Sequence, residues 1–545
     1  MSFCEECGAK LASGARFCEE CGAKVAASAI SEEIAEGCES ARDMPDADSS
    51  SEAMNIFSGA DWRRRWEAFA DSSADEEIGI IVTREKKLLS HIGCTDYHEF
   101  KKLVLRYITS AAERNVRYAY CDLDDCTFHY GGGETESVVA SLRRIVDVAC
   151  PKYLFILGNE EIVDVVRWKN QVPGDADAVV ESDLCYSTLD VNTPWDGQAY
   201  DFDEVMRVGR LPSRRDEGLA SYFRYFENAV RFIGSMDKVR PYGLSALVWK
   251  DESNEEYKAI SDDTVDVSPE ITAKDVYGRI DAEANLFFFN LHGSNDTRFW
   301  YGQSASSYPE AFEPAILDGR GNPYFIGVEA CYGARYLGGL DENQSVMMTA
   351  MRNRCMAFLG SSRIAFGAVK PEGCCADIVV GDFIRHLAEG RSVGDAHVEG
   401  LRHLSADDDG MDDTDVKTLA EFSLYGDPSS RMGHGKLRGD AGKSFKSLGS
   451  KKGLPIPMPD VRRRVQTALA EVDAKIEAAI DDFAMRNLLP ELMQKGLVSA
   501  RQAVFKMNDG GLNQKVYSLE SGPIVRIAKV YFDNDGNIHK ALVSK

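Results

Sequence analysis

Two reactive side chains, His292 and Cys331, each follow a short apolar run and precede a glycine. They lie in the segments NLHGS (290–294) and EACYGA (329–334). A thiol with a histidine in reach can attack a carbonyl carbon, and backbone N–H groups beside a glycine can hold the resulting oxyanion. A cysteine at a strand end is more often a buried structural thiol. The pattern alone therefore leaves both roles open for Cys331.

Four other cysteines form a repeated pair near the start of the chain, where FCEECGAKL (3–11) returns as FCEECGAKV (17–25). The two Cys-x2-Cys pairs supply four thiolates, which is the ligand set of a closed, structural Zn²⁺ site. Two coincidental pairs or a redox site are the alternatives, and the duplicated spacing argues against both. The predicted zinc ligands are Cys4, Cys7, Cys18 and Cys21.

Alternating apolar runs and amphipathic segments place both reactive side chains at strand ends. Short apolar runs separated by helical patterns predict an α/β fold with a mainly parallel sheet flanked by helices. In such sheets the chemistry gathers at the carboxyl ends of the strands. We expect helices over 97–114 and 137–149, and strands over 78–83, 116–123, 152–158, 242–249, 284–293, 323–330 and 355–361.

The composition divides the chain into four parts. Residues 1–25 form the predicted zinc ribbon, and the acidic stretch 26–55 reads as a flexible linker. Residues 56–445 form the α/β domain, and 446–545 a small α+β module of unknown role. Within that module we expect helices over 459–484 and near 488–507, and strands over 523–532 and 537–543.

Charge and hydropathy exclude several classes of function. A formal net charge of −25 disfavours nucleic-acid binding, because a phosphate backbone would be repelled. No apolar run is long enough to span a membrane, and the N-terminus does not read as a signal peptide. We therefore expect a cytoplasmic protein, in which the 14 cysteines are reduced thiols or metal ligands.

Several ordered blocks over roughly 78–430 resemble the caspase-fold cysteine peptidases, and among them the gingipain family, peptidase C25. The His-Gly and Ala-Cys pairs resemble the catalytic motifs of that family, and Asn159 stands where aspartate is usual in its "LxGD" segment. The remaining blocks are SDLCYSTLD (182–190), VMRVGRLP (205–212), AFLGSSRIAFG (357–367) and LYGDPSS (424–430).

The resemblance implies a role for each matching residue. Cys331 falls on the nucleophile and His292 on the general base, with Gly293 beside the oxyanion. An acid after the preceding strand orients the histidine, and the candidates are Asp251 and Glu252. For the pocket that receives the substrate side chain before the cleaved bond (P1), the resemblance implies Asp262, Asp263 and Trp300. A buried carboxylate there would suit arginine or lysine at P1.

Calcium is a further cofactor that the resemblance raises. The oxygen-rich loop with Asp190, Asn192, Asp196, Asp201 and Asp203 could bind Ca²⁺. A solvated acidic loop is the more common reading, especially in a cytoplasm poor in free calcium.

Together these observations favour a cytoplasmic cysteine endopeptidase that acts on protein or peptide substrates through a thioester intermediate. We expect the zinc ribbon to dock a protein partner. The alternative is a catalytically silent scaffold that binds partners through the zinc ribbon and the C-terminal module. Nucleic-acid binding by the zinc ribbon is a second rival, which the acidic charge disfavours.

Overall fold

The chain divides into two compact units, residues 1–53 and 54–545. The predicted zinc ligands and the acidic linker lie outside the residues that the structure describes. The computed structural model describes residues 55–71, 76–93, 97–126, 133–196, 200–214, 217–232, 238–295, 298–304, 307–336, 345–368, 373–406, 411–433, 466–469, 472–507 and 512–545.

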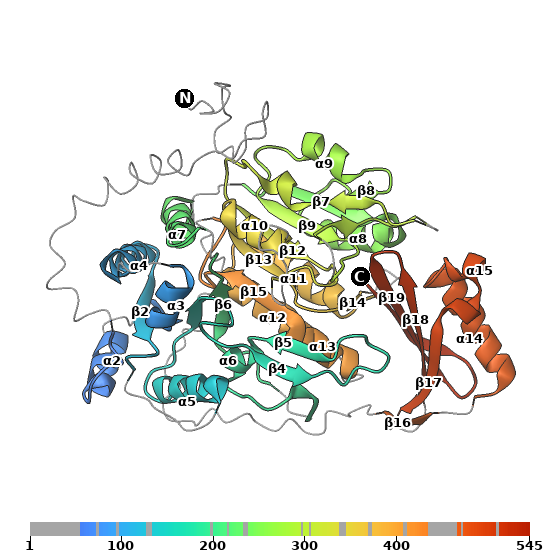
Figure 1. The fold of residues 1–545 in the computed structure, drawn as a ribbon, viewed down its shortest axis with the longest axis horizontal. Coiled ribbons are helices and arrows are strands. Elements are labelled where there is room, and N and C mark those ends of the chain that lie inside the picture. Colours follow the sequence, from blue (N-terminus) through green and yellow to red (C-terminus); the bar gives the residue numbers. More distant parts are fainter. Residues whose placement is uncertain are drawn as a thin grey trace. The chain divides into compact units, whose positions relative to one another are not determined.

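One sheet of ten strands organises the second unit (Figure 1). In spatial order its strands are β2 (Val116–Asp122), β1 (Glu77–Thr83), β3 (Tyr153–Leu157), β6 (Arg207–Leu211), β15 (Phe422–Gly426), β13 (Cys355–Ser361), β12 (Tyr324–Val328), β9 (Leu286–Asn290), β7 (Pro241–Ala246) and β8 (Asp266–Ser268). Neighbours pair in parallel, except that β13 pairs with β15 antiparallel. The sheet thus consists of two parallel halves that run in opposite directions.

The predicted α/β fold is confirmed, and its strands form where the sequence is most continuously apolar. Every residue of β9 and β12 is buried, as expected for strands covered on both faces. The expected strands are all present, with small shifts at their ends. One run ends early: residues 242–249 are extended only to Ala246, and Leu247–Trp249 form a short 3-10 turn.

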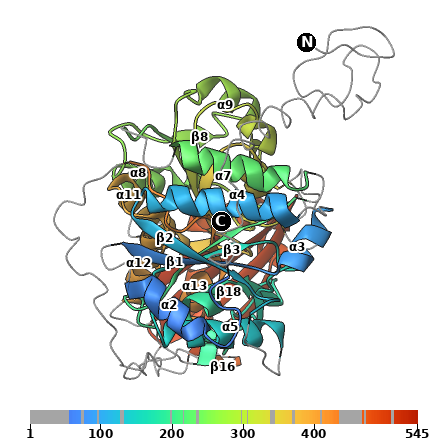
Figure 2. The same ribbon diagram turned by 90° about the vertical axis from the view of Figure 1, so that its left-hand side faces the viewer.

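Helices flank this sheet, and Figure 2 shows α4 and α7 side by side.

No helix of the described residues is long and apolar enough to cross a membrane. The helices are α2 (Trp62–Asp71), α3 (Glu85–His91), α4 (Tyr97–Ala112), α5 (Glu134–Val146), α6 (Leu184–Thr188), α7 (Ala220–Phe232), α8 (Lys250–Tyr257), α9 (Ala273–Arg279), α10 (Val346–Arg352), α11 (Ala376–Ala388), α12 (Val393–Ser405) and α13 (Asp413–Glu421). Two small antiparallel ribbons pair β4 (Val166–Lys169) with β5 (Val179–Ser182) and β10 (Trp300–Tyr301) with β11 (Glu310–Phe312).

The C-terminal residues build a second, antiparallel sheet with α14 (Ala474–Asn487) and α15 (Leu492–Lys495). Its order is β14 (Phe366–Gly367), β20 (Ile538–Ser544), β19 (Ile524–Asp533), β18 (Leu512–Ser521), β17 (Arg501–Met507) and β16 (Gln466–Leu469). The predicted strands over 523–532 and 537–543 are confirmed. The predicted helix over 459–484 is confirmed in its second half by α14, whereas Gln466–Leu469 form a strand and 459–465 lie outside the described residues. The predicted helix near 488–507 is wrong over Arg501–Met507, because these residues pair with β18.

Charged contacts fix this second sheet to the α/β domain. Lys540 Nζ lies 2.9 Å from the Asp412 carboxylate and 3.1 Å from that of Asp415, at the N-terminus of α13. Near the end of β9, the Ser294 hydroxyl donates to the Pro523 carbonyl over 2.6 Å. Strand β14 comes from the α/β domain but pairs with β20, so the α/β domain supplies the edge strand of the second sheet.

Candidate active site

The backbones that carry His292 and Cys331 are in direct contact. Strands β9 and β12 pair in parallel, with Phe289 opposite Val328, so both chains leave the sheet at the same edge. A Cβ added to Gly293 would lie 1.7 Å from the Cys331 carbonyl oxygen. Only glycine permits this approach, and the two strand ends are held together by it.

The turn after Cys331 is strained. Tyr332 has φ 54°, a left-handed conformation that is unusual for a bulky residue. Surrounding bonds hold it there: its N–H donates to the Arg363 carbonyl over 2.7 Å, and its hydroxyl to an Asp177 carboxylate oxygen over 2.7 Å. Such strain persists where the neighbouring structure enforces it, and it gathers at functional sites.

The thiol of Cys331 is buried and donates to the Ala365 carbonyl over 3.5 Å. Burial raises the pKa of the Cys331 thiol well above its usual range, so the group is neutral in this state. Among the described residues, no hydrogen bond joins the Cys331 sulfur to the His292 ring.

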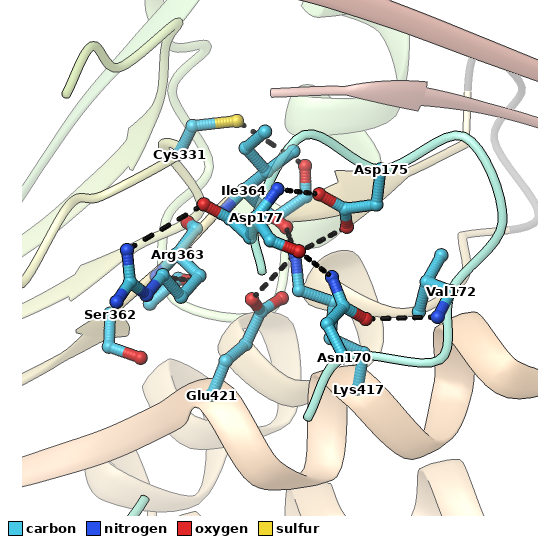
Figure 3. Close-up of polar contacts among 12 residues, drawn as sticks. Asn170, Val172, Asp175, Asp177, Cys331, Ser362, Arg363, Ile364, Lys417 and Glu421 are labelled. Atoms are coloured by element: carbon cyan, nitrogen blue, oxygen red, sulfur yellow. Dashed lines mark hydrogen bonds and ion pairs between the residues drawn. The ribbon is translucent and has the colours of Figure 1, made fainter. Parts of the chain in front are cut away.

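A buried lysine supports this turn from below, and Figure 3 shows carboxylates gathered around it. Lys417 Nζ lies 2.6 Å from Asp175, 3.1 Å from Asp177 and 3.4 Å from Glu421. It also donates to the Ile364 carbonyl over 2.7 Å. Since Asp177 accepts from Tyr332, Lys417 anchors the carboxylate that holds the turn after Cys331.

His292 is enclosed by polar and aromatic partners. Its Nε2 lies 2.7 Å from Gln303 Oε1, and its Nδ1 lies 3.3 Å from Arg526 Nη1. The Trp249 ring stands 4.3 Å away between centroids. Burial, and secondly the charge of Arg526, lower the pKa of His292 well below its usual range, so the imidazole is neutral here.

A pocket of carboxylates lies beside the two strand ends, and it holds the ammonium group of Lys545, the last residue of the sequence. Lys545 Nζ lies 2.8 Å from Asp377, 3.1 Å from Glu329 and 3.5 Å from Glu252. It also lies 4.5 Å from the centroid of the Trp249 ring. Burial opposes the charge, but these carboxylates raise the pKa of Lys545 well above its usual range.

Too many acids meet in this pocket for all to be ionised. Burial and the neighbouring carboxylates raise the pKa values of Glu252 and Glu256 well above the usual range. Ligand oxygens of Glu252, Glu256 and Asp377 lie within 4.8 Å of one another, a spacing that could also hold a metal ion. The cation beside them in this structure is the Lys545 ammonium.

The structure separates the other predicted site residues from this group. Asp251, Asp262 and Asp263 are exposed, and none of them takes part in the contacts described around Lys545. Glu252 is buried, but its carboxylate faces Lys545, and Gln303 takes the position beside His292 expected of an acid. Trp300 is buried in β10 against Phe289, at 5.2 Å between ring centroids, so it is part of the core.

Sequence reasoning missed Gln303, Glu329 and Asp377. Glu329 lies two residues before Cys331, at the end of the same apolar run, and this position is the one signal that could have marked it. Asp377 and Gln303 lie in segments without a local pattern. In the oxygen-rich loop that contains Asp190 and Asp201, their carboxylate oxygens accept the backbone N–H groups of Asn192 and Asp203.

Comparison with known protein families identifies the family of the chain and the class of enzyme to which it belongs. Residues 80–433 match the model of peptidase family C25, and residues 3–25 match that of the zinc-ribbon domain. The first match spans more than half of the chain, which therefore belongs to peptidase family C25. Membership of this family indicates a cysteine-type peptidase, and the resemblance drawn from the sequence is confirmed.

Two solved structures are similar to the chain. The crystal structure of the Arg-specific cysteine proteinase gingipain R (RgpB) is 12% identical, with a TM-score of 0.46 over 86% of this chain and 91% of that chain. A second, described as the structure of a protease, is 11% identical, with a TM-score of 0.44 over 86% and 91% of the two chains. Among curated proteins, none resembles the chain significantly in sequence.

Proposed function

We propose that the chain is a cysteine endopeptidase in which Cys331 is the nucleophile and His292 the general base. The observation that carries this proposal is the contact between Gly293 and the Cys331 backbone, which brings both strand ends to one edge of the sheet. The strained Tyr332 and the network beneath it support the same assignment, because they hold the Cys331 turn in a fixed shape.

The reaction follows from these groups. The Cys331 sulfur attacks the carbonyl carbon of the peptide bond after His292 removes the thiol proton, and the backbone N–H of Cys331 stabilises the oxyanion. His292 then gives its proton to the leaving amine. Water hydrolyses the thioester and releases the carboxylate product. Gln303 positions the imidazole through its bond to Nε2.

The substrate class follows from the carboxylate pocket. An array of buried acids next to the nucleophile favours a basic side chain at P1, because an unpaired carboxylate in an apolar environment is costly. Glu252, Glu329 and Asp377 serve this role in our proposal, in place of Asp262 and Asp263. We further propose a cytoplasmic location and a structural Zn²⁺ held by Cys4, Cys7, Cys18 and Cys21, in a ribbon that docks a protein partner.

The test uses fluorogenic peptides that end in Lys, Arg, Asp or Leu, under reducing conditions. Because Lys545 fills the pocket, the wild type and Lys545→Ala are assayed together, each with and without Cys331→Ala. We expect turnover of the Lys and Arg peptides that disappears with Cys331→Ala. If neither protein shows turnover dependent on Cys331, the scaffold alternative replaces the enzyme.

A further inference from the structure

Strand β20 and Lys545 lie where a substrate of the proposed peptidase would bind. Strand β20 pairs antiparallel with β14, with Ser544 opposite Phe366 and Val543 opposite Gly367. The pairing continues one residue further, since the Lys545 N–H donates to the Ala365 carbonyl over 3.0 Å. Extended peptides bind enzymes through this kind of strand addition. The segment 538–545 thus has the backbone arrangement of a bound peptide.

The backbone oxygen of Lys545 points at the nucleophile. It accepts the N–H of Cys331 over 3.3 Å. That N–H is the donor expected to stabilise an oxyanion, so the Lys545 carbonyl carbon occupies the place of the carbonyl that the thiol would attack. A lysine bound in P1 would put its backbone at this position.

The side chain of Lys545 completes the match. Its ammonium reaches Asp377, Glu329 and Glu252, as described above, while its stem passes over Gly367. A Cβ added to Gly367 would lie 2.0 Å from Lys545 Cε. The pocket therefore fits an unbranched, cationic side chain, and Gly367 leaves the space through which the stem of that side chain passes.

The second sheet also reaches the general base. Arg526, from β19, places Nη1 3.3 Å from His292 Nδ1 and donates to the Ser544 carbonyl over 2.8 Å. One arginine thus links the histidine to the residue before Lys545. Cys331 is 3% exposed and His292 1% exposed, so a substrate cannot reach them unless this segment moves.

We propose that residues 538–545 are a tethered inhibitor of the active site, with Lys545 bound as a P1 residue. This inference rests on the peptidase function proposed above. It assigns the second sheet a role: it holds the inhibitor in place through Lys540, Arg526 and the β14–β20 pair. Substrate cleavage requires withdrawal of this segment.

The test measures access to the thiol separately from turnover. The full-length wild type and Lys545→Ala are treated with iodoacetamide without denaturant, and alkylation is followed at each cysteine by peptide mass spectrometry. Removing the ammonium contacts should raise the rate at Cys331 by roughly tenfold or more, since the open state becomes more populated. The buried Cys355 serves as an internal reference, and Lys475→Ala, which changes an exposed lysine, is the matched control.

A second variant guards against misfolding of the first. Gly367→Ala puts a methyl group where the Lys545 stem lies, so it should raise alkylation of Cys331 while lowering turnover of lysine peptides. Thermal melts confirm that each variant is folded. Equal alkylation of Cys331 in the wild type and both folded variants would overturn the tethered inhibitor, whatever the turnover. Faster alkylation of Cys331 without any turnover would support the tethered inhibitor. The same result would count against the proposed peptidase function.

Discussion

The backbone N–H of Cys331 donates to the backbone oxygen of Lys545 across 3.3 Å. The two residues lie far apart in the sequence, and the second sheet brings them together. An oxyanion needs the same N–H, so an incoming carbonyl and Lys545 cannot both use it. This contact makes the access of a substrate to the proposed nucleophile, Cys331, depend on the C-terminal strand.

Gly293→Ala should disable the site. The added methyl group would lie 1.7 Å from the Cys331 carbonyl oxygen, so one of the two strand ends must move. Overpacking of this kind costs about 1–3 kcal/mol of stability. We expect turnover of lysine peptides to fall roughly a hundredfold, because a displacement of about 1 Å can have that effect. Gly278→Ala is the control, since an added Cβ there meets no atom within 4 Å; equal losses in both variants would count against the contact.

Gln303→Glu should shift the pH dependence of the reaction. A carboxylate 2.7 Å from His292 Nε2 favours the imidazolium and raises the pKa of His292. Since the base must be neutral, the acidic limb of the kcat/KM profile should move to higher pH. Gln303→Leu should lower kcat with little change in KM. The profiles are measured in the Lys545→Ala background, and an unmoved acidic limb would contradict the positioning role of Gln303.

Lys417→Met should destabilise the fold. The substitution removes the ammonium that contacts Asp175, Asp177 and Glu421. Asp175 and Asp177 then lose their nearest positive charge, and Arg363, 3.8 Å from Asp177, remains. Breaking a buried pair in this way costs about 3–5 kcal/mol. Urea denaturation followed by circular dichroism measures the loss. Lys274→Met, at an exposed position, should leave the curve unchanged.

Glu421→Gln should flatten the dependence of stability on pH. Burial raises the pKa of Glu421 to about 8, so the folded state holds its proton where the unfolded state has lost it. The stability contributed by protonated Glu421 is fully present below the pKa of the unfolded state. It is lost as pH rises toward about 8, and the free energy of unfolding falls by about 1.4 kcal/mol per pH unit in this range. Melting temperatures of wild type and variant should converge as pH falls below about 5. The exposed Glu67→Gln should follow the wild type at every pH.

Loss of zinc should leave the peptidase site intact. We expect metal analysis to find about one Zn²⁺ per chain, and none in a variant with Cys18→Ser and Cys21→Ser. The ligands and the active site belong to separate compact units, so turnover in the Lys545→Ala background should be unchanged. A parallel loss of zinc and turnover would show that the metal serves the catalytic unit.

The sheet was predictable because its strands are apolar along their whole length. The residues of β9 and β12 are buried at every position, and a short, continuously apolar run in the sequence predicts a strand of this kind. The second sheet was not predictable in the same way. Arg501–Met507 mixes polar and apolar residues, and only its pairing with β18 selects a strand over a helix.

In the candidate site, too, the local features were predictable from the sequence and the long-range contacts were not. His292 and Cys331 could be proposed from strand ends and glycines, which are local features. Their surroundings could not, because Gln303, Asp377 and Lys545 reach the site from separate segments through long-range packing. The family resemblance implies Asp262 and Asp263 as the acids of the P1 pocket. Asp377 instead comes from the start of α11, where no local pattern distinguishes it.

The β14–β20 pair has a kinetic consequence. A free peptide with the contacts of residues 538–545 would dissociate from the site on dilution. A covalently attached one meets the site at a fixed effective concentration, in the millimolar range for short flexible links. Inhibition should therefore be independent of enzyme concentration and respond to events that loosen the second sheet or the contacts of Lys545. A ligand of that sheet would act as a switch, and the fraction of open molecules, not the amount of enzyme, would set the rate of cleavage.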